Sequence, residues 1–173
     1  MGELGLLGVP WAEALGGAGF DTLSFMIAIE ELGKVDASHA LTISAHTTLG
    51  TSPIVNFGTS AQIERYVPLL ASGKVLGGFG LTEDNAGSDA GGTRSTAVRK
   101  HGHYLLNGSK RFITHAGVGE VFVVTAVTDP SMGTRGISSF ILTKDSCDLE
   151  ACRTHGVGHD DSTVNMSGFT SGK

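Results

Sequence analysis

The hydrophobic period of this chain changes near residue 74, and that change restricts the possible folds more than any other feature. Before residue 74, apolar residues recur at the three- and four-residue spacing of amphipathic helices; after it, short apolar runs alternate with turn signals. Helices followed by strands indicate segregated α and β parts rather than a doubly wound sheet. The sequence therefore predicts an α+β fold, with an antiparallel helical domain over residues 1–74 and an antiparallel, barrel-like or sandwich-like β domain over residues 75–173.

The helical part carries its own start and stop signals. Aspartates before two apolar stripes, and a Thr59–Gln62 capping box before a third, are typical of helix N-termini, whereas glycine and proline are typical of helix ends. The expected caps are Asp21, Asp36 and Thr59, and the expected stops are Gly33, Gly50 and Pro68. The short joints between these segments predict antiparallel helices that pack side by side.

The remainder of the chain has the pattern of short strands separated by turns. Asn107-Gly108 lies between two apolar runs, which is the strongest short-range signal for a β-hairpin, and His101-Gly102 and Asp129-Pro130 mark further turns. The expected strands are KVLGGFGLT (74–82), TRSTAVRK (93–100), HYLLN (103–107), KRFITH (110–115), EVFVVTAVT (120–128) and GISSFILTK (136–144). STVNMS (162–167) is a candidate for one more strand.

Composition excludes several classes of function. The formal net charge is −5 and there is no run of Lys and Arg, so we expect no nucleic-acid binding. We also expect no membrane span, because no apolar stretch approaches the roughly 20 residues that one requires. Cys147 and Cys152 lack a second pair to complete a zinc site, and the glycines between His155 and His159 argue against a helical metal site, so no metal is expected.

The stretch LGGFGLTEDNAGSDAGGT (76–93) is the candidate functional loop. It is no dinucleotide-binding fingerprint, because the third glycine would fall at Glu83 and strands follow instead of a helix; Walker and G-x-S-x-G motifs are also absent. The hydroxyls of Thr82 and Ser88, with the backbone N–H groups between them, could hydrogen bond a planar heterocycle and a phosphate. The acidic side chains fit that reading only if they point away or cap the loop. A rigid hairpin loop without a ligand is the alternative.

Several long segments occur in a recognisable order. FGLTEDNAGSDA, YLLNGSKRFITHAG and VFVVTAVTDPSMGTRGISSFIL follow the helical segments EELGKVDAS and SAHTTLGTSPIVNFGTSAQIERYVPLLASG. Together they resemble the acyl-CoA dehydrogenase family of flavoproteins, from about residue 3 to about residue 166. The resemblance implies FAD-dependent α,β-dehydrogenation of acyl-CoA thioesters, as in fatty acid β-oxidation. It further implies electron-transferring flavoprotein as the electron acceptor, a homotetramer, and a location in the bacterial cytoplasm or the mitochondrial matrix.

The resemblance also assigns roles to individual positions. It implies flavin contacts for Phe79, Gly80, Leu81, Thr82, Gly87, Ser88, Phe112, Ile113 and Thr114. In the family pattern, Thr82 would donate its hydroxyl to the isoalloxazine ring, and Ser88 would approach the pyrophosphate and the CoA part of the substrate. The Phe112 ring would pack on the flavin, and Thr114 would hydrogen bond near its N5 atom. Neutral donors of this kind stabilise the negative charge that the ring gains on reduction.

The sequence departs from the family pattern at some positions. Asp84 stands where proline is usual, His115 where asparagine is usual, and Asp160 where arginine is more common. The family's catalytic base is a glutamate of a C-terminal helical domain, which we expect to lie beyond residue 173, so no catalytic residue and at most trace activity are expected of this chain alone. A non-catalytic flavin- or CoA-binding module, or a related flavin oxidase or monooxygenase on the same scaffold, remain as alternatives.

Overall fold

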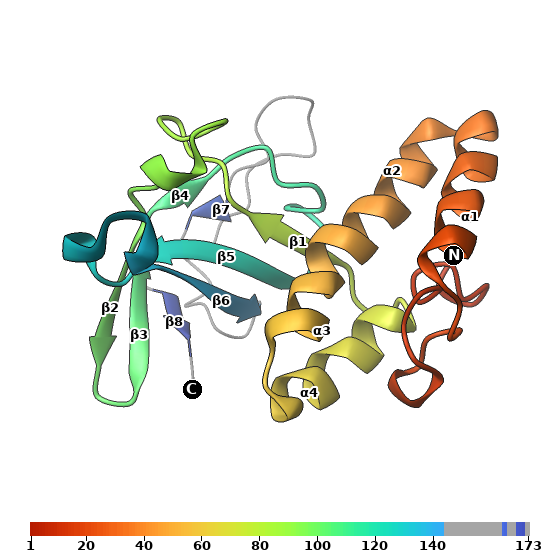
Figure 1. Ribbon diagram of the computed structural model, residues 1–173, viewed down its shortest axis with the longest axis horizontal. Helices are drawn as coiled ribbons and strands as arrows, with labels where there is room; N and C mark the ends of the chain where they lie inside the picture. Colours follow the sequence, from red (N-terminus) through yellow and green to blue (C-terminus); the bar gives the residue numbers. More distant parts are fainter. Residues whose placement is uncertain (144–163, 166–168, 172–173) are drawn as a thin grey trace. The chain divides into compact units, whose positions relative to one another are not determined.

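The computed structural model describes residues 1–143, 164–165 and 169–171, the last five by their backbone only (Figure 1). The chain divides into two compact units, Met1–Gly78 and Phe79–Lys173. The first consists of helices and the second mainly of strands, so the predicted α+β class is confirmed. Among the described residues, no helix combines the length and the apolar character needed to cross a membrane.

The helical unit follows the expected start signals closely. Its elements are η1 (Glu13–Leu15), α1 (Thr22–Val35), α2 (Ala37–Ala45), the π-helical turn η2 (His46–Thr51), α3 (Ser52–Phe57) and α4 (Ser60–Ala71). Asp21 accepts a hydrogen bond from the Ser24 N–H at the start of α1, and Asp36 caps α2 in the same way. Thr59 and Gln62 form the complete capping box of α4. The three predicted caps are therefore confirmed.

The three predicted stops are wrong, because each lies inside a helical segment. Gly33 is within α1, which ends at Val35, where the N–H of Asp36 closes the last turn on Leu32 O. Gly50 lies in η2, through which the helical path continues into α3. A Cβ on Gly50 would lie 2.5 Å from the Gly77 carbonyl carbon, so glycine here allows two backbones to approach closely rather than ending a helix.

Pro68, the third of these, lies inside α4, which continues to Ala71. Proline removes one helical hydrogen bond, which normally weakens a helix. The two last residues of α4, Leu70 and Ala71, are almost completely buried, so packing stabilises the final turn in spite of that loss.

The core of the helical unit is small and apolar, with one buried imidazole beside it. Its buried members are Leu7, Val9, Phe25 and Ile43, packed against Leu6, Ile29, Leu32 and Leu76. His46 is fully buried; its Nε2 lies 3.0 Å from Leu70 O, and its Nδ1 accepts a hydrogen bond of 3.0 Å from the Gly77 N–H. This assigns the N–H to Nε2, and the ring joins the end of α4 to the segment that begins β1.

The β unit is built on a six-stranded sheet. The strands of the unit are β1 (Gly77–Gly80), β2 (Thr96–Lys100), β3 (His103–Asn107), β4 (Ser109–Lys110), β5 (Val121–Val127), β6 (Ile137–Thr143), β7 (Val164–Asn165) and β8 (Phe169–Ser171). The sheet order is β1-β5-β2-β3-β8, and β6 pairs with β5 along its whole length; β4 and β7 form a separate pair. A short helical turn, η3 (Ala90–Gly92), precedes β2, and η4 (Pro130–Gly136) joins β5 to β6.

The sheet is mixed and, over the described residues, open, whereas the sequence predicted an antiparallel barrel or sandwich. The β2–β3 and β5–β6 hairpins are antiparallel, but they meet through a parallel contact between Thr96 and Val127. Figure 1 shows the two hairpins, with β5 and β6 extending to the right from near the upper ends of β2 and β3. Two hairpins that meet at the start of one strand and the end of another need not close a barrel.

The turn signals had mixed outcomes. The β2–β3 hairpin turns at His101-Gly102, where Gly102 has a φ of 84°. Asn107-Gly108 forms no hairpin, because β3 pairs with β2 and β8 whereas β4 pairs with β7. Gly108 instead lies against Ser95, where a Cβ would clash. KRFITH is not a strand beyond Lys110, since Phe112 and His115 adopt left-handed conformations.

The core of the β unit gathers side chains from both hairpins and from the segment after β4. Its members are Ala97, Leu106, Ile113, Ala116, Phe122, Val124, Ala126, Phe140 and Leu142, with Tyr104 packed against it. The Tyr104 and Phe140 rings meet edge to face, with their centroids 5.1 Å apart. This core supports one side of the two segments that hold the candidate site, residues 79–95 and 110–116.

Candidate functional site

The first segment of the candidate site runs from β1 into a tight turn. Phe79 is half-buried and Gly80 is buried in β1; a Cβ on Gly80 would lie 2.8 Å from Val124 Cγ1, so packing against β5 requires glycine. After Leu81 and Thr82, which are half-buried, the Glu83 N–H donates to Ala86 O (2.9 Å) and the Ala86 N–H donates back to Glu83 O (3.1 Å). This pair of hydrogen bonds fixes the turn on which the following residues depend.

Gly87 and Ser88 follow the turn and are exposed. A Cβ placed on Gly87 would meet no atom within 4 Å, so the space beside this backbone is open. The side chain of Asn85 donates to Gly92 O (2.9 Å) and closes the loop from one side to the other. An ordered loop with open space along its backbone is suited to contact a ligand directly.

The second segment follows β4 and is conformationally unusual. Phe112 and His115 have φ values of 56° and 70°, which side-chain-bearing residues rarely adopt. Phe112 is 63% exposed, whereas Ile113 is 1% exposed in the core and Thr114 is half-buried. A large aromatic side chain held outward by a left-handed backbone points to a contact with something other than this unit's own core.

The structure brings these two segments together through their backbones. The Arg111 N–H donates to Thr82 O at 2.8 Å, so Thr82 lies beside the residue that precedes Phe112. Of the residues predicted to contact a flavin through their side chains, Ser88 and Phe112 are exposed, and Thr82 and Thr114 are half-buried. The Ile113 side chain lies in the core, so only its backbone could face a ligand.

Beneath this meeting point lies a buried polar cluster that the sequence reasoning did not identify. We call Glu83, Lys110, Thr93 and Thr125 the Glu83–Lys110 cluster. Lys110 is 0% and Glu83 7% exposed, and their Nζ and Oε1 atoms are 2.7 Å apart. Lys110 also donates to Leu81 O (3.1 Å), Thr93 Oγ1 (2.9 Å) and Thr125 Oγ1 (3.1 Å).

The carboxylate of Glu83 also accepts hydrogen bonds from residues 93–95, at the other end of the loop. It accepts hydrogen bonds from the Arg94 N–H (2.7 Å), the Ser95 N–H (3.1 Å) and the Thr93 hydroxyl. The sequence allowed the acidic residues of this loop to cap it, and Glu83 does so. No sequence pattern pointed to its partner Lys110, because 27 residues separate the two.

The environment of Glu83 strongly favours its charged form. Burial opposes ionisation, but hydrogen bonds from Lys110, Ser95, Thr93 and Arg94 outweigh it and lower the pKa of Glu83 to about 2. Burial also lowers the pKa of Lys110, against the opposing effect of Glu83. A carboxylate with so low a pKa and so many donors is a poor proton acceptor near neutral pH.

A second ion pair lies next to the first in sequence but at the surface. Arg111 contacts Asp84, with their side chains 43% and 68% exposed. Asp84 is the position at which the family pattern usually has proline. The exposed pair joins the same two segments as the Glu83–Lys110 cluster, but water screens it.

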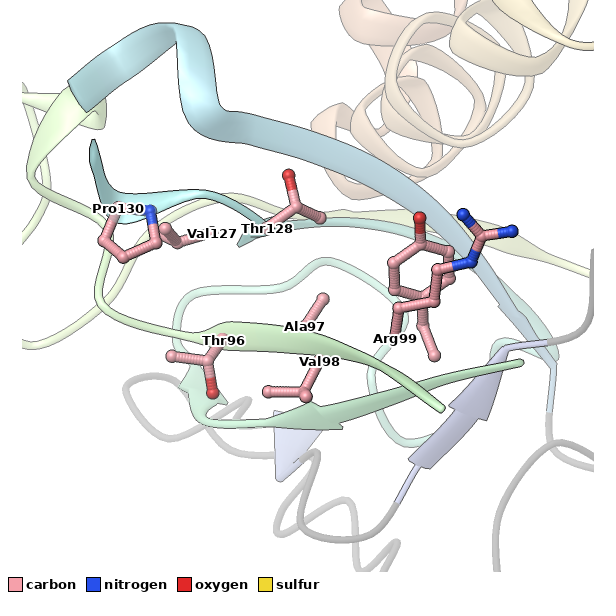
Figure 2. A pocket seen from close by; sticks show the side chains of 8 residues that line it. Thr96, Ala97, Val98, Arg99, Val127, Thr128 and Pro130 are labelled. Atoms are coloured by element: carbon pink, nitrogen blue, oxygen red, sulfur yellow. The ribbon is translucent and has the colours of Figure 1, made fainter. Parts of the chain in front are cut away.

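A separate pocket of about 450 Å³ opens on β2 near the end of β5. It is lined by Thr96, Ala97, Val98, Arg99, Tyr104, Val127, Thr128 and Pro130, none of which was predicted to contact a ligand. Figure 2 shows these side chains, with Pro130 and Arg99 at opposite ends. The histidines and cysteines weighed as metal ligands, between residues 147 and 159, lie outside the described residues.

Comparison with known proteins gives a consistent match. The profile of the acyl-CoA dehydrogenase N-terminal domain matches residues 1–74, and that of the middle domain matches residues 78–170. An acyl-CoA dehydrogenase of Bacillus subtilis is 48% identical over 146 residues, which are 84% of this chain and 38% of that protein.

Solved structures agree with the sequence matches. Butyryl-CoA dehydrogenase from Megasphaera elsdenii has a TM-score of 0.91 at 37% identity, over 98% of this chain and 46% of its own. An acyl-CoA dehydrogenase from Bacillus anthracis, solved in complex with FAD, has a TM-score of 0.88 at 35% identity, over 99% of this chain and 30% of its own. This chain therefore spans less than half the length of these relatives.

Proposed function

We propose, since the chain belongs to the acyl-CoA dehydrogenase family, that it supplies one side of an FAD site in an enzyme that dehydrogenates acyl-CoA thioesters between the α and β carbons. The observation that carries this proposal is the left-handed, exposed Phe112 held beside Thr82 by the Arg111–Thr82 hydrogen bond. An outward aromatic ring next to neutral donors suits a planar, mostly apolar ligand.

The residues present fit a flavin in three respects. The Phe112 ring offers an exposed apolar surface, the half-buried Thr82 and Thr114 offer hydroxyl donors, and the space beside Gly87 is open to a phosphate-bearing chain. When bound, FAD supplies a hydride acceptor. Around it, Thr82 and Thr114 would donate hydrogen bonds without a mobile charge, and Phe112 would exclude water from the reacting face.

Ser88 would serve both the cofactor and the substrate. It lies exposed beyond the Glu83–Ala86 turn, in the part of the loop whose ends are held by Asn85 and Glu83. From there its hydroxyl and the neighbouring N–H groups would approach the flavin pyrophosphate and the CoA part of an acyl-CoA.

Two carboxylates beside this site are poorly suited to remove the substrate α proton. Glu83 is buried, and its hydrogen bonds hold its pKa near 2; Asp84 is paired with Arg111 at the surface. We infer that a residue other than Glu83 and Asp84 removes this proton. Electrons would then pass to an electron-transferring flavoprotein, in an enzyme assembled as a homotetramer.

Titration of the purified chain with FAD, followed by flavin absorbance and fluorescence, tests the proposal. We expect saturable binding that Phe112→Ala weakens by up to about tenfold, the equivalent of an aromatic contact of about 1.4 kcal/mol. Phe57→Ala, which removes an exposed phenylalanine of the helical unit, is the matched control and should leave the affinity unchanged.

The hydroxyl donors are tested in the same titration. Thr82→Ala and Thr114→Ala should each weaken FAD binding, whereas Thr22→Ala, at an exposed threonine of α1 in the helical unit, should not. Equal affinities for all of these variants would show that the flavin, if bound, lies elsewhere.

A further inference from the structure

We propose that Glu83 and Lys110 are positioning residues, which set the two flavin-facing segments relative to each other without touching the cofactor. This inference rests on the proposed FAD site and adds to it a pair of residues that act through Thr82 and Phe112. The cluster joins the carbonyl that precedes Thr82 to a residue two positions before Phe112.

Lys110 ties three parts of the β unit to one ammonium group. Its hydrogen bonds reach Leu81 O in the first segment, Thr93 at the far end of the loop, and Thr125 in β5. Since β5 lies in the middle of the sheet, the ammonium connects both ends of the loop to the central strand. Moving or removing Nζ would release Leu81 O, and with it the backbone that places Thr82.

Glu83 holds the other end of the loop by accepting hydrogen bonds from backbone N–H groups. It accepts from the Arg94 and Ser95 N–H groups, which lie 11 and 12 residues further along the chain. Residues 84–93, including Gly87 and Ser88, are therefore closed at their base by one carboxylate. Without it, two backbone N–H groups at the end of the loop would lose their acceptor.

The choice of a buried ion pair argues for a positional role. A buried ion pair contributes little net stability over an apolar pair of similar volume, because desolvation offsets the attraction. What an ion pair provides in addition is directional hydrogen bonding, and here those bonds end on the segments that carry the proposed flavin contacts. The direct Arg111–Thr82 hydrogen bond, 2.8 Å long, is the contact that this arrangement protects.

The test compares Lys110→Met and Glu83→Gln with the exposed controls Lys100→Met and Glu120→Gln. Amide hydrogen exchange at Arg111, measured without FAD, should be at least tenfold faster in both cluster variants than in the controls. With saturating FAD, the absorbance band and the reduction potential of the bound flavin should shift toward those of free flavin, because the ring contacts are displaced.

The outcomes separate this inference from the proposed function. If the wild-type chain binds no FAD, the proposed function fails. Faster amide exchange at Arg111 in the two cluster variants would then still show that Glu83 and Lys110 position the two segments. If the cluster variants remain folded with wild-type Arg111 exchange, or bind FAD with a wild-type band and potential, the positioning role is overturned. Should Lys110→Met fail to fold, Glu83→Gln, which preserves the side-chain shape, decides the matter by the same readouts.

Discussion

The two units of this chain use polar side chains in contrasting ways. In the helical unit, Asp21, Asp36 and Thr59 cap helices from exposed positions, with partners two or three residues away. In the β unit, Lys110 and Glu83 are buried, and their partners lie 10 to 29 residues away. The caps define where single helices begin, whereas the Glu83–Lys110 cluster fixes several segments at once. Loss of a cap should therefore act locally, and loss of the cluster should disturb the whole candidate site.

The helical unit contains one instructive exception. His46 is buried and bonds to residues 24 and 31 positions away, so it behaves like the cluster rather than like the caps. It joins the end of α4 to the start of β1, which no local signal could do. The difference therefore follows burial and sequence separation, and not the type of secondary structure.

The largest expected effect is that of Lys110→Met on stability. It leaves Glu83 as a buried charge without its ammonium, which should lower the free energy of unfolding by about 3–5 kcal/mol. Urea denaturation measures this directly. Lys100→Met, at an exposed position of β2, should change the value by less than about 0.5 kcal/mol. An equal loss of unfolding free energy in Lys110→Met and Lys100→Met would contradict the claim that the buried lysine contributes more to stability than the exposed one.

Acid should weaken the cluster next. The folded-state pKa of Glu83 is about 2, below the 4.5 of an unperturbed glutamate, so its contribution to stability is complete above about pH 4.5 and is lost as the pH falls through about 2. As the pH is lowered from about 4.5 to about 2, the urea midpoint of unfolding should fall less steeply for Glu83→Gln than for the wild type. Hydrogen bonds from Ser38 and His39 also lower the pKa of Asp36 to about 2, so Asp36 titrates over the same pH range. The variant Asp36→Asn is therefore the control that separates its contribution from that of Glu83.

Removal of a helix cap should have a moderate and local effect. Thr59→Ala opens the capping box of α4 and should cost about 1 kcal/mol. Amide exchange should rise in the first turn of α4 and remain unchanged at Arg111. A change at Arg111 would mean that the cap, like the cluster, acts over a distance.

The smallest expected effect is that of Asp84→Asn. The Asp84–Arg111 pair is exposed on both sides, so its loss should change the free energy of unfolding by less than about 1 kcal/mol and less at high salt. Thermal denaturation at low and high salt measures it. A loss comparable to that of Lys110→Met would show that the surface pair, and not the buried one, holds the two segments together.

The same contrast explains which features the sequence could predict. The caps of α1, α2 and α4 depend on neighbouring residues and were confirmed, as were the turns at His101-Gly102 and Asp129-Pro130, which each connect two paired strands. Gly50 and Pro68 gave wrong stops, because their roles depend on packing against distant residues. The strand expected over 110–115 failed since Phe112 and His115 adopt left-handed conformations that residue type alone does not indicate.

The candidate site divides in the same manner. Family resemblance pointed to Thr82, Ser88 and Phe112, whose assignment as flavin contacts remains a prediction. Lys110 and Glu83, which hold the segments that carry them, left no pattern in the sequence, because a partnership across 27 residues has no periodicity. Only the backbone path of β1 and β4 brings the two charges together.

The most direct test of the central claim is a double-mutant cycle in FAD affinity between Lys110 and Phe112. If Lys110 acts by holding Phe112 in place, Lys110→Met should weaken FAD binding in the wild-type background and have a much smaller effect when Phe112 is already alanine. We expect a coupling of at least about 0.5 kcal/mol between the two substitutions. The same fold-change in both backgrounds would contradict the account, since Lys110 would then affect FAD binding independently of the ring that it is thought to position.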